Sequence, residues 1–132
     1  MNFAVVCWIG ACAATVFGLA FLAAPEATAA LYGIQGWNEG TAVIGRLFGA
    51  QLLCMAALLW TLKDDTDRDT HRRCAQWMSG ASAVAAAVAL HAVLTGATNT
   101  WGWTTVAIYA FFVVTWGWLL RERSGPVRIA IH

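Results

Sequence analysis

Residues 3–24 read FAVVCWIGACAATVFGLAFLAA, an uncharged apolar run that decides the fold class of this chain. A helix of about 20 apolar residues crosses the roughly 30 Å hydrocarbon core of a bilayer. The small residues Ala23 and Ala24 near its end are typical of a signal-peptide cleavage site, but no Lys or Arg precedes the run. We therefore predict a retained transmembrane helix.

Three further apolar runs follow, and together the four predict helices at about 3–24, 37–62, 74–95 and 101–120, with a tail at 121–132. The chain has 132 residues, of which 60% are hydrophobic and 11% charged, whereas soluble domains average about 45–50% and 25%. We expect a single membrane domain of the all-α class, folded as an up-down-up-down bundle of four transmembrane helices.

The distribution of Lys and Arg predicts the orientation. Four of these residues lie in 63–73 and three in 121–132, whereas the connections 25–36 and 96–100 contain none. Cytoplasmic loops carry the excess of positive charge, so the N-terminus, the middle loop and the C-terminus are expected in the cytoplasm of a multi-pass cell-membrane protein. Basic clusters beside helix ends leave no surface for nucleic acid, so no nucleic-acid partner is expected.

Tryptophan favours the headgroup level of a bilayer, and the eight tryptophans all lie near predicted helix ends, as belts at both interfaces would require. Outer ends carry Trp37, Trp101 and Trp103, and inner ends carry Trp8, Trp60, Trp77, Trp116 and Trp118. The four cysteines show no paired spacing and are predicted to act as small buried hydrophobic residues.

Arg46 is the charge that stands inside an apolar run, and intramembrane charges are costly enough to indicate function. Glu39 precedes it by two helical turns and projects from nearly the same face. Gly45 and Gly49 allow another helix to approach closely beside the arginine. We predict that this neighbour is the helix at 74–95, whose small residues lead to His91.

These residues predict an outward-opening polar pocket. Substrate-binding candidates are Arg46, Gln51, Trp37, Asn99, Trp101 and Tyr109, and the catalytic candidates are Glu39 and His91. Glu39 and His91 would serve as acid and base on a substrate that Arg46 holds by an anionic group. In the alternative, Arg46 pairs with Glu39 or with a carbonyl at a helix end, and His91 hydrogen-bonds between helices. These contacts stabilise the bundle and involve no substrate.

Several chemistries lack their motifs. The sequence has no Cys and His cluster at metal spacing, no second buried His for a haem, and no glycine-rich phosphate loop. We therefore expect no metal and no cofactor.

The chain also contains several short motifs along its length. They are Pro25, Leu31-Tyr32-Gly33, Gly45-Arg46-Leu47-Phe48-Gly49-Ala50, the Arg72-Arg73 pair and the Trp-rich last helix. In this layout the chain resembles the small bacterial four-helix membrane proteins related to the DoxX-like group. The resemblance implies the four-helix fold and assigns no catalytic residue. That group mixes redox-associated subunits with other members, which favours a partner protein.

Two function classes remain. In the first, the outer-leaflet pocket binds, and in one version transforms, a lipid or other lipophilic small molecule with a polar head. In the second, the chain is a non-catalytic accessory subunit that assembles with itself or with a larger membrane complex. An open cavity beside Arg46 would favour the first class, and a closed salt bridge with an exposed small-residue groove the second.

Overall fold

The computed structural model describes residues 2–122, and five helices make up all of its regular secondary structure in that range. They are α1 (Phe3–Ala23), α2 (Pro25–Leu31), α3 (Glu39–Leu62), α4 (Arg68–Leu94) and α5 (Gly102–Glu122). All but the seven-residue α2 are long and apolar enough to cross a membrane. The all-helical class is thus confirmed, while most of the predicted tail, 123–132, lies outside the described residues.

Polar side chains set the starts of α3 and α4. Asn38 and Thr41 form a reciprocal capping box at the start of α3. The Asp67 carboxylate accepts a hydrogen bond from the Thr70 backbone N–H at 2.8 Å. Because of this cap, α4 begins at Arg68, six residues before the predicted start at 74, and includes charged residues that the sequence suggested would form a turn.

Glycines in the left-handed conformation end α2 and α4. Gly33 has φ +73° and Gly96 has φ +72°. After each glycine, the next N–H turns back to a carbonyl of the helix, from Ile34 to Ala29 and from Ala97 to Ala92. A hydrogen bond of this kind after a residue of positive φ is characteristic of the Schellman motif. Glycine adopts this left-handed conformation without steric cost.

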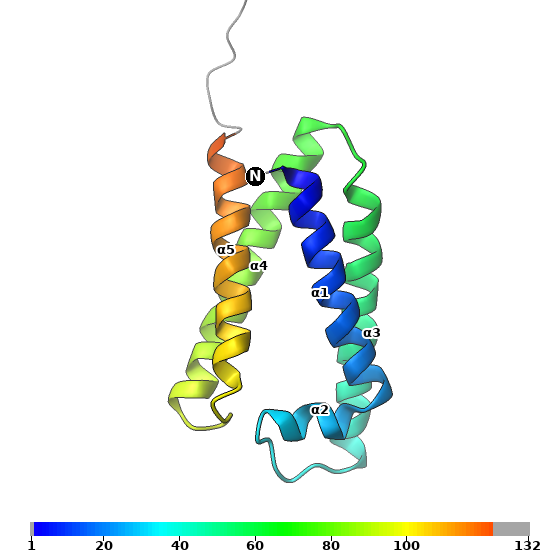
Figure 1. Ribbon diagram of the computed structural model, residues 1–132, viewed down its shortest axis with the longest axis vertical. Coiled ribbons are helices and arrows are strands. Elements are labelled where there is room, and N and C mark those ends of the chain that lie inside the picture. Colours follow the sequence, from blue (N-terminus) through cyan, green and yellow to red (C-terminus); the bar gives the residue numbers. More distant parts are fainter. Residues whose placement is uncertain (1, 123–132) are drawn as a thin grey trace, which may run out of the picture.

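The long helices associate in two pairs, α1 with α3 and α4 with α5. Between the pairs, α1 also contacts α5. Figure 1 shows the two pairs meeting beside the N-terminus and diverging toward the end where α2 lies. The turn between α3 and α4 lies at the first end, whereas α2 and the turn between α4 and α5 lie at the second.

Gly49 brings α3 into backbone contact with α1. A methyl group placed on Gly49 would lie 2.7 Å from the Gly18 carbonyl oxygen and 2.7 Å from the Leu22 nitrogen. The predicted close helix approach beside Arg46 is therefore present. However, the neighbour is α1 and not the predicted helix at 74–95, because α3 pairs with α1 along its length.

A buried cluster closes the narrow end of the molecule. The Phe3 ring stacks on the His71 imidazole at 3.8 Å between centroids and meets the edge of Trp116 at 5.9 Å. His71 also contacts the Asp65 carbonyl oxygen through Nε2 at 2.7 Å. Trp116 is fully buried in this cluster, so its predicted place in a tryptophan belt is wrong.

Cysteine burial is mixed. Cys7 is buried in the same cluster, and Cys74 is half-buried beside it. Cys12 and Cys54 are exposed on the outer surface of α1 and α3, so the expectation of four buried cysteines is wrong for these two.

Candidate functional site

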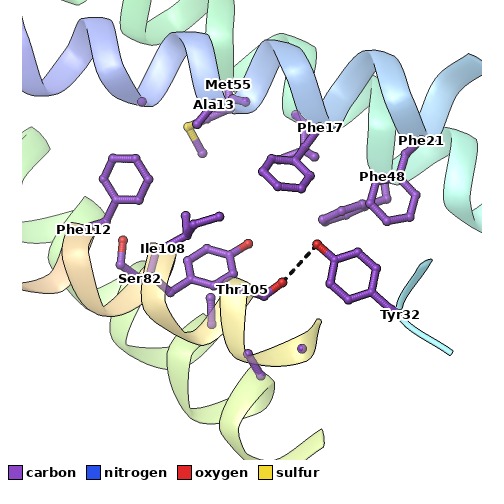
Figure 2. A pocket seen from close by; sticks show the side chains of 18 of the residues that line it. Ala13, Phe17, Phe21, Tyr32, Phe48, Met55, Ser82, Thr105, Ile108 and Phe112 are labelled. Atoms are coloured by element: carbon purple, nitrogen blue, oxygen red, sulfur yellow. Dashed lines mark hydrogen bonds between the residues drawn. The ribbon is translucent and has the colours of Figure 1, made fainter. Parts of the chain in front are cut away.

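A cleft of about 440 Å³ lies between the two helix pairs. All four long helices line it, and Tyr32 and Ile34 from the segment after α2 complete the wall. Figure 2 shows Phe17 of α1 facing Thr105 and Ile108 of α5 across the open space, and Phe21 beside Phe48 near Tyr32. The volume falls within the range of about 300–1,000 Å³ typical of ligand pockets.

Small side chains on α4 explain why this space is open. Apart from Met78, the face of α4 toward the cleft carries four alanines and one serine, namely Ala81, Ser82, Ala85, Ala89 and Ala92. Side chains of this size cannot reach the aromatic side chains of α1 and α3. At the narrow end, Phe112 and Met55 fill the gap and pack against the buried cluster. The cleft therefore tapers toward the buried cluster and widens toward α2.

Hydroxyl groups are the main polar feature of the cleft. The Thr105 hydroxyl donates a hydrogen bond to the Tyr32 hydroxyl at 3.3 Å (Figure 2), which joins the segment after α2 to α5. Tyr109, one turn further along α5, also lines the cleft. The buried Thr98 hydroxyl oxygen, in the turn before α5, has no hydrogen-bond partner within residues 2–122. These groups can both donate and accept hydrogen bonds without carrying charge.

Asn99 connects the two helix pairs at the wide end. Its side-chain amide donates to the Leu31 carbonyl oxygen and its backbone N–H donates to the Tyr32 carbonyl oxygen, each at 2.8 Å. The same side chain accepts a hydrogen bond from the Trp101 N–H at 2.9 Å. Asn99, predicted to bind substrate, thus holds Tyr32 in place at the mouth of the cleft.

A second depression, which we call the outer hollow, lies where α1, α2 and the start of α3 meet. Its volume is about 720 Å³, and it is lined by alanines together with Glu26, Trp37, Asn38, Glu39 and Arg46. Among residues 2–122 no salt bridge joins Arg46 to either glutamate. The predicted association of Glu39, Arg46 and Trp37 is thus present, as a shared depression and not as a closed ion pair.

The remaining predicted residues lie elsewhere. His91 is exposed on the outward face of α4, and Gln51 and Trp101 are also exposed; none of the three lines the cleft or the outer hollow. The single polar pocket expected from the sequence is therefore divided among separate surfaces. The reason is the pairing of α3 with α1, which leaves His91 and Arg46 on helices that do not pack together.

The cleft itself was not predicted from the sequence. Its hydroxyl groups at Tyr32, Thr98 and Thr105 stand among apolar residues, and no spacing in the chain distinguishes them from interfacial residues. One signal was present: Phe17 and Phe21 lie one turn apart and indicate an aromatic face on α1. Within residues 2–122, His, Cys, Asp and Glu side chains form no group of three that could hold a metal ion.

Comparison of the chain with protein-family models, curated proteins and solved structures found no match. The resemblance to the DoxX-like group therefore stays a prediction, and the functional argument depends on the geometry of the site.

Proposed function

We propose that this protein binds a lipophilic small molecule in the cleft between its helix pairs. The observation that carries the proposal is an apolar cleft of about 440 Å³ with hydroxyl groups gathered toward its wide end. The apolar body of the ligand would pack between Phe17, Phe48 and Ile108. Its polar head would exchange hydrogen bonds with the hydroxyl groups of Tyr32, Thr105 and Tyr109.

The polar head is expected to be uncharged. Within residues 2–122, no Asp, Glu, Lys, Arg or His lines the cleft. A buried charge without a partner costs far more than a hydroxyl or carbonyl group that finds hydrogen bonds. The sequence-based acid and base, Glu39 and His91, lie outside the cleft, so the proposal is for binding, and chemical transformation of the ligand is not part of it.

We also propose that the four long helices form the up-down-up-down bundle in the membrane, with both termini in the cytoplasm. The distribution of charge supports this orientation. The basic segment 63–73 belongs to the narrow end, and the connections without Lys or Arg belong to the wide end where α2 lies. The cleft would then open within the outer leaflet.

Native mass spectrometry of gently extracted protein tests the binding proposal. We expect a retained small molecule in the parent protein. Ala85→Phe places a ring in the cleft and should abolish retention, because the ligand and the ring would occupy the same space. The matched control is Ala83→Phe, on the same helix but exposed and outside the cleft, and it should retain the ligand.

Equal retention in Ala83→Phe and Ala85→Phe would exclude the cleft as the binding site. The helicity of both variants is measured by circular dichroism. A variant that keeps the helicity of the parent but retains no small molecule has lost binding and not its fold.

A second candidate function, that of an accessory subunit, is favoured by the outward face of α4. Only 6% of the membrane-spanning window of α4 is buried, and Gly80, Ala87 and His91 are exposed on it. A histidine facing lipid is costly, whereas one covered by a partner helix finds a hydrogen bond. In this case Ala83→Phe would displace a retained subunit in the same mass spectra, and Ala85→Phe would not.

A further inference from the structure

The outer hollow contains charges of both signs that do not neutralise one another. Glu26 is the second residue of α2, Glu39 is the first residue of α3, and Arg46 lies two turns further along α3. No salt bridge joins these three side chains within residues 2–122, although they share one depression. Two anionic groups and one cationic group are therefore available to a ligand.

Along α3, the anionic group comes first and the cationic group second, counted from the start of the helix. Glu39 is the first residue of the helix, and Arg46 follows about 10 Å further along the axis. The same face then continues to Ala50 and Cys54, which are both exposed and uncharged. From the end of the molecule inward, the surface is anionic, then cationic, then apolar.

A phospholipid with an amino headgroup carries the complementary order. Its ammonium group lies outermost, its phosphate lies deeper, and its acyl chains follow. The 24-residue α3 is about 36 Å long and so exceeds the roughly 30 Å hydrocarbon core by about 3 Å at each end. The Arg46 Cα therefore lies about 7 Å inside the core, and its long side chain can extend outward toward the phosphate level. Guanidinium and phosphate form charge-assisted hydrogen bonds, which are among the stronger polar contacts in proteins.

We infer that the outer hollow is a binding site for a phosphoethanolamine headgroup, with Arg46 on the phosphate and Glu26 and Glu39 on the ammonium group. A primary ammonium can donate hydrogen bonds to both carboxylates, which the quaternary ammonium of a choline headgroup cannot do. The acyl chains of the lipid lie along the exposed Ala50 and Cys54 face. The source of the headgroup is a membrane lipid and not a soluble phosphoester.

This site is independent of the proposed function, because the outer hollow and the cleft share no lining residue. If the experiments disprove one of the two binding proposals, the other proposal still stands. Ala85→Phe, which fills the cleft, should therefore leave headgroup binding unchanged.

The test is native mass spectrometry of the full chain in detergent with equal amounts of phosphatidylethanolamine, phosphatidylglycerol and phosphatidylcholine of identical acyl chains. We expect the parent protein to retain phosphatidylethanolamine in preference to the other two. Arg46→Gln should weaken retention of every phospholipid about tenfold or more, because a charge-assisted hydrogen bond is lost. The control Arg72→Gln removes an exposed arginine at the other end of the molecule and should change nothing.

The double variant Glu26→Gln with Glu39→Gln distinguishes the contribution of the ammonium group to binding from that of the phosphate. It should lose the preference for phosphatidylethanolamine while keeping phosphatidylglycerol, since Arg46 still binds the phosphate. Both glutamates are exposed near helix starts, so this variant also decides the question if Arg46→Gln does not fold. Equal retention of the three lipids by the parent, or an unchanged preference in the double variant, would overturn the assignment.

Soluble phosphoethanolamine distinguishes the two sources of the headgroup. We expect no displacement of the retained lipid at equal concentration, because the acyl chains contribute to binding. Full displacement would show that the site takes a soluble phosphoester and would overturn the assignment to a lipid.

Discussion

Gly49 allows α1 and α3 to touch through backbone atoms. The two atoms that a methyl group at this position would meet at 2.7 Å belong to the backbone of α1, so neither can move aside by changing a side-chain rotamer. We predict that Gly49→Ala lowers the free energy of unfolding by about 1–3 kcal/mol, the usual cost of overpacking. Thermal unfolding in detergent, followed by circular dichroism, measures this change.

Gly80→Ala is the control at the residue scale. Gly80 lies within α4, and a methyl group on it would have no atom of another part of the described chain within 4 Å. Because alanine is the better helix former, this variant should be as stable as the parent or more stable by about 0.5–1 kcal/mol. Similar unfolding temperatures for the Gly49 and Gly80 variants would contradict the contact between α1 and α3.

Residue spacing predicted part of this contact. Gly45 and Gly49 indicated a close helix approach, and the structure places Gly45 against Pro25 and Trp37 and Gly49 against α1. The partner helix could not be predicted, because small residues show only that a neighbour can come close. The small residues of the predicted helix at 74–95 were expected to meet these glycines, yet Ala83 and Ala87, which are two of them, are exposed in α4.

At the scale of elements, the start of α4 depends on one carboxylate. Asp67 accepts hydrogen bonds from the Thr70 hydroxyl at 2.7 Å and from the Thr70 backbone N–H at 2.8 Å. These bonds lower the pKa of Asp67 from its usual value near 3.8. A carboxyl group with a lowered pKa in the folded state stabilises the protein above its unfolded pKa, and this contribution is lost as the pH falls through the folded pKa.

We therefore predict that the unfolding temperature of the parent falls on acidification from about pH 5 to about pH 3, and that part of this fall is absent in Asp67→Asn. Asparagine still caps the helix but does not titrate. Asp64→Asn is the control, because Asp64 is largely exposed and caps no helix, and its surface salt bridge with Lys63 contributes little to stability. An equally steep decline in Asp67→Asn and the parent would show that the cap does not contribute to acid stability.

Helix ends were predictable to the extent that their signals are local. Gly96 directly follows the predicted helix at 74–95 and ends α4 in the structure, because its motif depends on the backbone of the helix that it closes. Gly33 ends α2 in the same way. Pro25 likewise marks the start of α2. The start of α4 was missed, since apolar length measures the part of a helix within the membrane and not its extension into water.

At the scale of the whole molecule, the number of long helices followed from hydropathy, whereas their packing did not. Every long helix exposes apolar side chains, so hydropathy does not distinguish a face toward lipid from a face toward another helix. The cleft arises from this undetermined packing, because it requires the alanines of α4 to face the aromatic residues of α1. Among the predicted site residues, Trp37, Glu39 and Arg46 line one depression, because one helix and its adjoining loop supply all three.

The orientation of the whole molecule gives the last prediction. A reporter fused after His132 should be found in the cytoplasm, and one inserted near Gln35 should be found outside, because Lys and Arg concentrate in 63–73 and 121–132. Replacing Lys63, Arg68, Arg72 and Arg73 with glutamine should give a mixed orientation, since all four Lys and Arg residues of 63–73 are then removed. A reporter that is external after His132 in the parent would contradict the proposed topology. It would place α2 and the outer hollow at the cytoplasmic surface, where the headgroup bound by Arg46 would come from the inner leaflet.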